Sequence, residues 1–125
     1  MCIRDRAEVD PFVDGAAVRR IGDVTFPIAQ AAGVELHAVE EGRICVEMLA
    51  LYQSDGIIAE PAGALATAAL GQVDIPHGST TVCLLSGGNN DVSRYADIVE
   101  RALVCLLYTS PSPRDLSTSR MPSSA

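Results

Sequence analysis

The stretch that decides the predicted fold is TTVCLLSGGNND, residues 80–91. Its first half is a continuous apolar run, which is typical of a strand in the interior of a parallel sheet. Its second half changes abruptly to serine, two glycines, two asparagines and an aspartate. This change indicates a polar loop, after which Asp91 or Ser93 begins a helix. A buried strand, a loop and a helix in this order predict one unit of an α/β domain.

Outward from this stretch, strand patterns alternate with helical patterns along the chain. Further strands are expected at residues 17–21, 34–39 and 56–60. Helices are expected at residues 23–32, 41–54 and 61–71, and from residue 91 onward. Alternation of this kind predicts an α/β fold with a partial parallel sheet flanked by helices. Four strands are fewer than a complete sheet of this class usually has.

Composition and charge narrow the classes of function. The chain has 125 residues and a formal net charge of −7, which disfavours nucleic acid or an anionic membrane as a partner. The most apolar stretch, residues 57–70, contains Glu60 and Pro61 and is too short to span a bilayer. A cytoplasmic location is therefore expected. The basic residues are all arginine, so the chain offers no lysine amine for covalent catalysis.

The two ends of the chain differ from its middle. Residues 105–125 are rich in proline and serine, which predicts a disordered tail. A codon reading of MCIRDR, residues 1–6, has a reverse complement that encodes CLLYT, the sequence of residues 105–109. Both ends are therefore predicted to be adapter-derived and non-native, which leaves residues 7–104 as the biological fragment. The alternative is a genuine N-terminus and a genuine flexible tail.

The cysteines and histidines do not form a recognisable metal site. Cys45 and Cys83 lie in helical and strand patterns, and no C-x-x-C spacing occurs, so no zinc site is predicted. Both are expected to be buried, reduced thiols. His37 and His77 have no partner at catalytic or metal-ligand spacing, so structural or surface roles are expected.

Three elements are candidates for a binding site, because ligands of open α/β sheets bind beyond the carboxyl ends of the strands. They are Asp14-Gly15, Glu60 and the loop from Ser86 to Asn89. Glycines would let the backbone approach a ligand closely, and a serine hydroxyl can donate and accept. The alternative is structural: the loop is then a helix-initiating turn that needs glycine for positive φ, and Glu60 is a helix N-cap.

Three motifs together are more specific than any of these elements. DPFVDGAAVRRIGDVTF, IIAEPAGAL and VCLLSGGNNDVSRYADIVERAL resemble threonine dehydratase (threonine ammonia-lyase), a fold-type II pyridoxal-phosphate enzyme. The resemblance covers residues 7–104 only, as a fragment. It implies the C-terminal part of a catalytic domain with the tryptophan synthase β-like fold. It also implies pyridoxal 5'-phosphate as cofactor and deamination of L-threonine to 2-oxobutanoate and ammonia, in isoleucine biosynthesis.

The resemblance also implies roles for particular residues. Ser86 would bond to the pyridine nitrogen, Gly15 would pack on one face of the ring, and Glu60 would lie near it. The wall around the pyridine edge would be formed by Gly87, Gly88 and Asn89. A hydroxyl at this place makes the ring a milder electron sink than a carboxylate would, which suits β-elimination.

The chain departs from the family in two respects. The family's Schiff-base lysine and its glycine-rich phosphate cradle are absent, so no catalytic residue is assigned and the fragment itself is expected to be inactive. The full-length enzyme to which such a fragment would belong is called the parent here. Its expected substrate is an amino acid, and it is expected to be a homo-oligomer. The alternatives are a relative acting on serine or threo-hydroxyaspartate, a serine racemase relative, or a non-catalytic small-molecule-binding α/β module.

Overall fold

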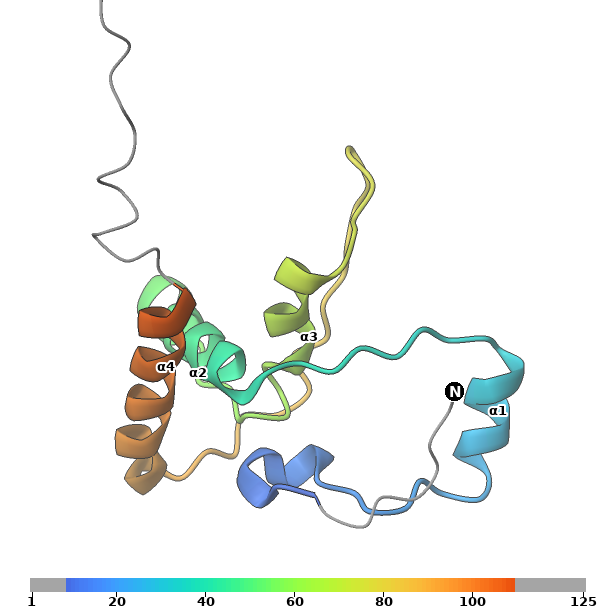
Figure 1. The fold of residues 1–125 in the computed structure, drawn as a ribbon, viewed down its shortest axis with the longest axis horizontal. Coiled ribbons are helices and arrows are strands. Elements are labelled where there is room, and N and C mark those ends of the chain that lie inside the picture. Colours follow the sequence, from blue (N-terminus) through green and yellow to red (C-terminus); the bar gives the residue numbers. More distant parts are fainter. Residues whose placement is uncertain (1–8, 110–125) are drawn as a thin grey trace, which may run out of the picture.

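The computed structural model describes the backbone of residues 9–109 and the side chains of residues 9–107. The segments drawn in grey in Figure 1 are not described. The elements in chain order are η1 (Pro11–Ala16), α1 (Thr25–Ala31), α2 (Glu41–Ala50), η2 (Leu51–Asp55), α3 (Leu65–Ala68), η3 (Ala69–Gln72), η4 (Val92–Arg94) and α4 (Tyr95–Thr109). Of these, η2 is a π turn that continues α2, and η1, η3 and η4 are 3-10 helices.

The predicted partial parallel sheet is wrong, because residues 9–109 contain helices and connecting segments but no strand. The apolar run that was expected to be a buried strand is solvent-exposed, with Val82 84% and Leu84 74% accessible. A single backbone hydrogen bond, from Glu60 N–H to Gly87 O at 3.1 Å, joins the ends of two expected strands. The physical reason is that a strand needs a neighbour's backbone and apolar face, which a sequence pattern does not supply.

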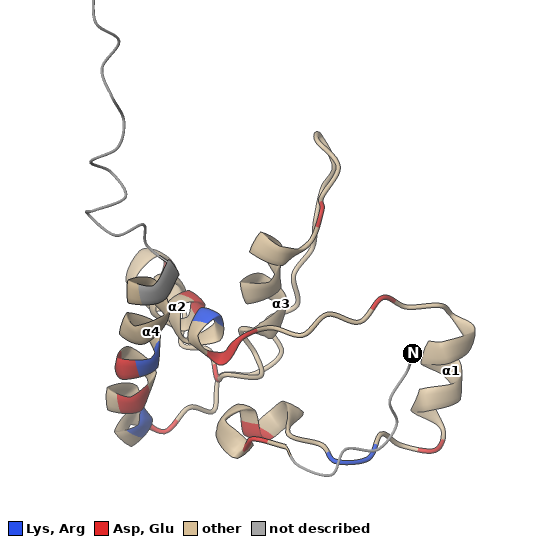
Figure 2. Cartoon of the chain, viewed as in Figure 1, with Lys and Arg blue, Asp and Glu red and all other residues tan. Residues whose placement is uncertain are grey.

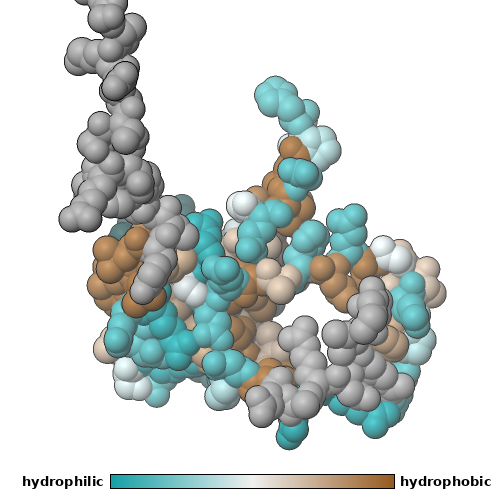
Figure 3. Space-filling model, viewed as in Figure 1, coloured by the Kyte–Doolittle hydropathy of each residue, from teal (hydrophilic) through white to brown (hydrophobic). Residues whose placement is uncertain are grey.

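The segments that were expected to be strands are extended connections instead. Residues 32–40 lead from α1, which buries no side chain, back to α2. Residues 73–85 form an arm that leaves the end of α3 and returns (Figure 1). Apolar side chains lie at the surface along this arm and over part of the α2–α4 pair (Figure 3).

The helices follow the sequence pattern more closely. The expected helix at residues 41–54 is formed by α2 and its π turn, and Gly56 ends it in the left-handed conformation, with φ +67°. The carboxylate of Asp91 caps the start of η4 by accepting from Ser93 N–H at 2.9 Å, as expected. This hydrogen bond to the backbone lowers the pKa of Asp91. The expected helix at 61–71 is shorter, because α3 begins only at Leu65.

The core lies between α2 and α4, which run side by side (Figure 1). Ile44 and Met48 of α2 are buried with Ile98 and Ala102 of α4. Phe12 of η1 belongs to the same cluster. These side chains recur at helical spacing, so each helix buries one apolar stripe.

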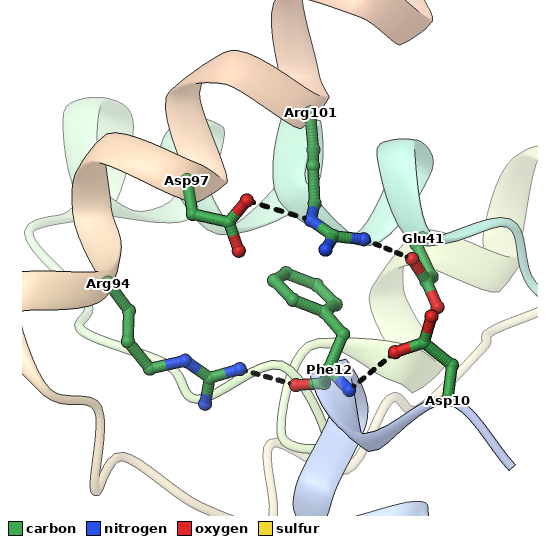
Figure 4. Close-up of polar contacts among 6 residues, drawn as sticks. All are labelled: Asp10, Phe12, Glu41, Arg94, Asp97 and Arg101. Carbon is green, nitrogen blue, oxygen red and sulfur yellow. Dashed lines mark hydrogen bonds and ion pairs between the residues drawn. The ribbon is translucent and has the colours of Figure 1, made fainter.

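An arginine on α4 covers this core and pairs with both helices. The Arg101 guanidinium lies 4.2 Å from the centre of the Phe12 ring, within cation–π range. It donates to Asp97 at 3.0 Å and to Glu41 at 2.5 Å (Figure 4). Asp97 and Arg101 lie one turn apart on α4, at the spacing at which opposite charges stabilise a helix. Figure 2 shows the charged residues gathered here on α4 and at the start of α2.

The two cysteines of the middle region differ in burial. Cys45 is buried as expected, and burial raises the pKa of its thiol to about 11. Cys83 is only partly buried, and its Sγ lies 3.6 Å from Ala66 O. The described residues contain no group of three His, Cys, Asp or Glu side chains placed to hold a metal ion.

Two further expectations concern the ends of the chain and the membrane. Residues 1–6 and most of the 105–125 segment lie outside the described residues, while residues 105–109 continue α4. The assignment of both ends as non-native therefore stays a prediction. None of the described helices combines the length and the apolar composition that crossing a bilayer requires.

Stability should depend on the α2–α4 contact far more than on exposed apolar residues of the same helix. We expect Ile98→Ala to lower the free energy of unfolding by about 2–5 kcal/mol, because Ile98 is fully buried. Leu103→Ala is the matched control, since Leu103 is 54% exposed. Urea titration followed by circular dichroism measures both, and equal losses would contradict this core.

The thiol of Cys45 should react slowly although it is not in a disulfide. With a pKa of about 11, its thiolate is about one thousandth of the population at pH 8, and burial also blocks access. Iodoacetamide at pH 8, followed by peptide mass spectrometry, should label Cys83 well before Cys45. The difference should disappear in denaturant, and early labelling of native Cys45 would be inconsistent with its burial.

Candidate functional site

The three elements singled out in the sequence meet around Glu60. Its backbone N–H donates to Gly87 O. This hydrogen bond joins the loop of residues 86–89, the SGGN loop, to the turn before α3. A Cβ atom built on Gly87 would lie 2.2 Å from Glu60 Oε1, and one built on Gly15 would lie 3.4 Å from the same oxygen. Glu60 therefore lies between η1 and the loop, half-buried, with glycine on both sides.

This convergence requires glycine because of space and not because of backbone conformation. Neither Gly87 nor Gly88 has positive φ. A Cβ on Gly88 would lie 2.9 Å from Ile58 O, and one on Gly63 would lie 2.3 Å from Gly87 O. Real side chains do not occupy such distances, so the two backbones can lie this close only without side chains.

The structural alternative for the loop is thus correct in part. Asp91 does cap the helical segment that follows, so the loop does initiate a helix. Glycine is present for close approach, however, and the positive φ expected under that alternative is not found at 87 or 88. Glu60 is not a side-chain N-cap of α3, which begins with Ala64 in the cap position and no side-chain cap.

The six predicted site residues divide into two groups. Gly15, Glu60, Gly87 and Gly88 are brought into close proximity, as described above. Ser86 and Asn89 lie at either end of the same loop with exposed side chains. Their exposure leaves the hydroxyl and the amide accessible to a ligand.

Two residues that the sequence analysis did not single out also belong to this region. Gly63 makes the closest approach to another backbone. It lies within the motif IIAEPAGAL that the sequence analysis quoted, so the motif already contained it. The amide of Asn90 is buried, and neither of its polar atoms has a hydrogen-bond partner within the described part of the chain. Buried amide atoms are rarely left unpaired, so this position can accept a further polar partner.

The segment that carries Gly15 is fixed by hydrogen bonds at both ends. Asp10 accepts from Phe12 N–H at 2.8 Å and so caps η1 (Figure 4). Asp14 accepts from Gly15 N–H at 2.9 Å. The guanidinium of Arg94, just beyond the SGGN loop, donates to Phe12 O at 2.5 Å. Gly15 is therefore held by short-range and long-range contacts together.

A separate groove lies between the start of α2 and α4. It is lined by four carboxylates, those of Glu40, Glu41, Asp97 and Glu100, with Arg101 as the one arginine in its lining. None of the predicted cofactor residues lines it. The concentration of negative charge makes it unsuited to an anionic group such as a phosphate ester.

Comparisons with known proteins find curated relatives of this chain. No protein-family model matches the chain. The chain is 61% identical over 100 residues to the biosynthetic L-threonine dehydratase of Mycobacterium tuberculosis (strain ATCC 25618 / H37Rv), covering 78% of this chain and 23% of the relative. The enzymes of the same name from Mycobacterium leprae and Staphylococcus aureus (strain NCTC 8325 / PS 47) are 57% and 47% identical, over 78% and 77% of this chain and 23% of each relative.

The resemblance to threonine dehydratase predicted from the three motifs is therefore confirmed. The chain is homologous to a segment of the biosynthetic L-threonine dehydratases. It spans about a quarter of the length of the curated relatives that it matches.

The close approach at Glu60 can be tested with a set of glycine variants. Gly87→Ala should lower the free energy of unfolding by about 1–3 kcal/mol, because the new methyl group meets the Glu60 carboxylate. Adding Glu60→Ala should recover most of this loss, since the obstacle is the end of a side chain. Glu60→Ala should not rescue Gly63→Ala, whose obstacle is the Gly87 backbone.

Gly71→Ala is the matched control for this set. Its new Cβ would lie 3.1 Å from the flexible guanidinium of Arg43, so little change is expected. Urea unfolding of all variants gives the comparison. Rescue of both Gly87→Ala and Gly63→Ala by Glu60→Ala, or of neither, would contradict the geometry at this site.

Proposed function

We propose that this chain is a segment of a pyridoxal-phosphate-dependent threonine dehydratase and that it forms one wall of the cofactor site. The observation that carries the proposal is the meeting of Gly15, Glu60 and Gly87 at one point, in a chain 61% identical to an enzyme of that name. The proposed parent enzyme is cytoplasmic and homo-oligomeric, and deaminates L-threonine to 2-oxobutanoate and ammonia.

The residues present fit one part of a pyridoxal phosphate site. Gly15 has no side chain, which lets η1 approach the turn at Glu60 and Ala62 closely and so holds this part of the proposed wall in place. The exposed hydroxyl of Ser86 can donate to a ring nitrogen or accept from it. Glu60 lies beneath the loop, where it supports the wall that Gly87, Gly88 and Asn89 form. When bound, the cofactor supplies an electron sink for the carbanion left when the substrate loses its α-proton.

Two further parts of a pyridoxal phosphate site, the covalent anchor and the phosphate site, are not found among the residues described above. The chain has no lysine to hold the cofactor covalently, and the groove between the start of α2 and α4 is acidic and does not suit a phosphate. We therefore propose that residues outside this chain supply the covalent anchor and the phosphate site. The chain alone is then inactive.

The exposed apolar residues favour this proposal over a free-standing binding module. A self-contained module buries its large apolar side chains, whereas Leu36, Val82 and Leu84 are largely exposed here. These side chains do not belong to the core formed by α2 and α4. They suit a segment that is covered by further protein.

A chimera tests the proposed function directly. Residues 7–104 would replace the matching segment of the Mycobacterium tuberculosis relative, which supplies the rest of the enzyme. We expect the chimera to form 2-oxobutanoate from L-threonine, and Ser86→Ala to reduce the rate about tenfold or more through loss of one polar contact to the cofactor. The 125-residue chain alone should form none.

The control for this experiment is Ser54→Ala, at an exposed serine in the π turn after α2. It should leave the rate unchanged. A folded chimera without activity, or one that Ser86→Ala does not affect, would refute the proposed role. Turnover by the isolated chain would refute its proposed inactivity.

A further inference from the structure

The contacts around Glu60 form a closed loop that returns to η1 through Arg94 of η4. Gly15 lies against the turn at Glu60 and Ala62, and Glu60 N–H bonds to Gly87 O. From Gly87 the chain runs through the loop and η4 to Arg94. Arg94 then reaches back to η1, 82 residues earlier in the sequence.

Arg94 contacts η1 in three ways. Its guanidinium donates to Phe12 O at 2.5 Å, lies 5.2 Å from the centre of the Phe12 ring, and approaches Asp14 Oδ2 at 3.7 Å. The side chain is 28% exposed, so it is partly shielded from water. A planar group with several donors can make all three contacts at once, which a lysine ammonium cannot.

These contacts act on the residue next to the site. Asp14 holds Gly15 N–H with one carboxylate oxygen and faces Arg94 with the other. The bonds of η1 itself are few and local, such as that from Ala17 N–H to Asp14 O at 3.2 Å. A short 3-10 helix of this kind is not stable by itself, so its position depends on long-range contacts.

We propose that Arg94 is a positioning residue for the candidate cofactor site. It holds η1 so that Gly15 faces Glu60. It thereby fixes the distance between η1 and the turn that carries Glu60. This inference rests on the proposed function, because it concerns the same site. Arg101 differs, since it stacks on Phe12 but forms its hydrogen bonds with α2 and α4.

The test uses the full 125-residue chain and nuclear magnetic resonance. In Arg94→Gln, we expect the amide of Ala17 to exchange with solvent about tenfold faster, because a charged hydrogen bond that holds η1 is lost. The proton contact between Gly15 and the Ala62 methyl group should weaken or disappear. The amide of Ile44, bonded to Glu40 O in α2, should be unchanged.

Three further variants separate positioning from general loss of stability. Arg94→Lys keeps the charge and can keep one of the contacts but loses the planar guanidinium, so it should restore part of the protection of Ala17. Asp14→Asn removes the exposed partner only and should accelerate exchange about twofold to threefold, as expected for a surface ion pair. Arg20→Gln, which removes an exposed arginine paired with Asp23, should leave Ala17 unchanged.

Two outcomes would overturn the inference. In the first, Ala17 exchange and the Gly15–Ala62 contact are unaffected in Arg94→Gln. In the second, Ile44 exchange accelerates equally, which would mean that Arg94 supports the whole fold. The chimera assay measures cofactor chemistry, whereas the exchange of Ala17 measures the placement of η1, so failure of the proposed function and failure of this inference give different results.

Discussion

The close approach of two backbones at Gly63 and Gly87 is the constraint on which the candidate site depends. A Cβ on Gly63 would lie 2.3 Å from Gly87 O, so the loop can rest on the turn before α3 only where residue 63 lacks a side chain. A Cβ on Gly87 would instead lie 2.2 Å from Glu60 Oε1, so glycine at 87 makes room for the Glu60 carboxylate. Glu60 then bonds its N–H to the loop and extends its carboxylate beneath it. Close packing without side chains leaves little freedom to shift, so the position of Ser86 and Asn89 at the loop's ends follows from this contact.

The core and the site are held by different forces and are joined at η1. Between α2 and α4 the core contacts are apolar, with Ile44 and Ile98 fully buried, and the Arg101–Glu41 ion pair joins the two helices beside this core. At η1 they are polar, and Phe12 takes part in both, since its ring is buried in the core and its carbonyl accepts from Arg94. The position of η1, and with it that of Gly15, therefore depends on both the apolar core and the hydrogen bond from Arg94.

The sequence predicted the helices and the convergence of the site better than it predicted the fold class. Helical spacing is a local property, so the apolar stripe of residues 44 and 48 and the cap at Asp91 could be inferred. Strand formation is not local, and Val82 and Leu84 are exposed because no neighbouring strand covers them among the described residues. The hydrogen bond from Arg94 to Phe12 O could not be inferred either, because a contact between residues 82 positions apart leaves no periodic signal in one sequence.

The placement of the two polar groups of the site bears on the chemistry proposed for it. The carboxylate of Glu60 is half-buried beneath the loop, whereas the group at the exposed end of the loop is the hydroxyl of Ser86. A carboxylate at position 86 would hold a proton on a ring nitrogen and strengthen the electron sink, but a neutral hydroxyl does not. A milder sink is sufficient for β-elimination, because loss of the β-hydroxyl removes the negative charge from the substrate's α-carbon. If Ser86 faces the ring nitrogen as proposed, the site would suit removal of a β-substituent better than reactions that need a long-lived carbanion.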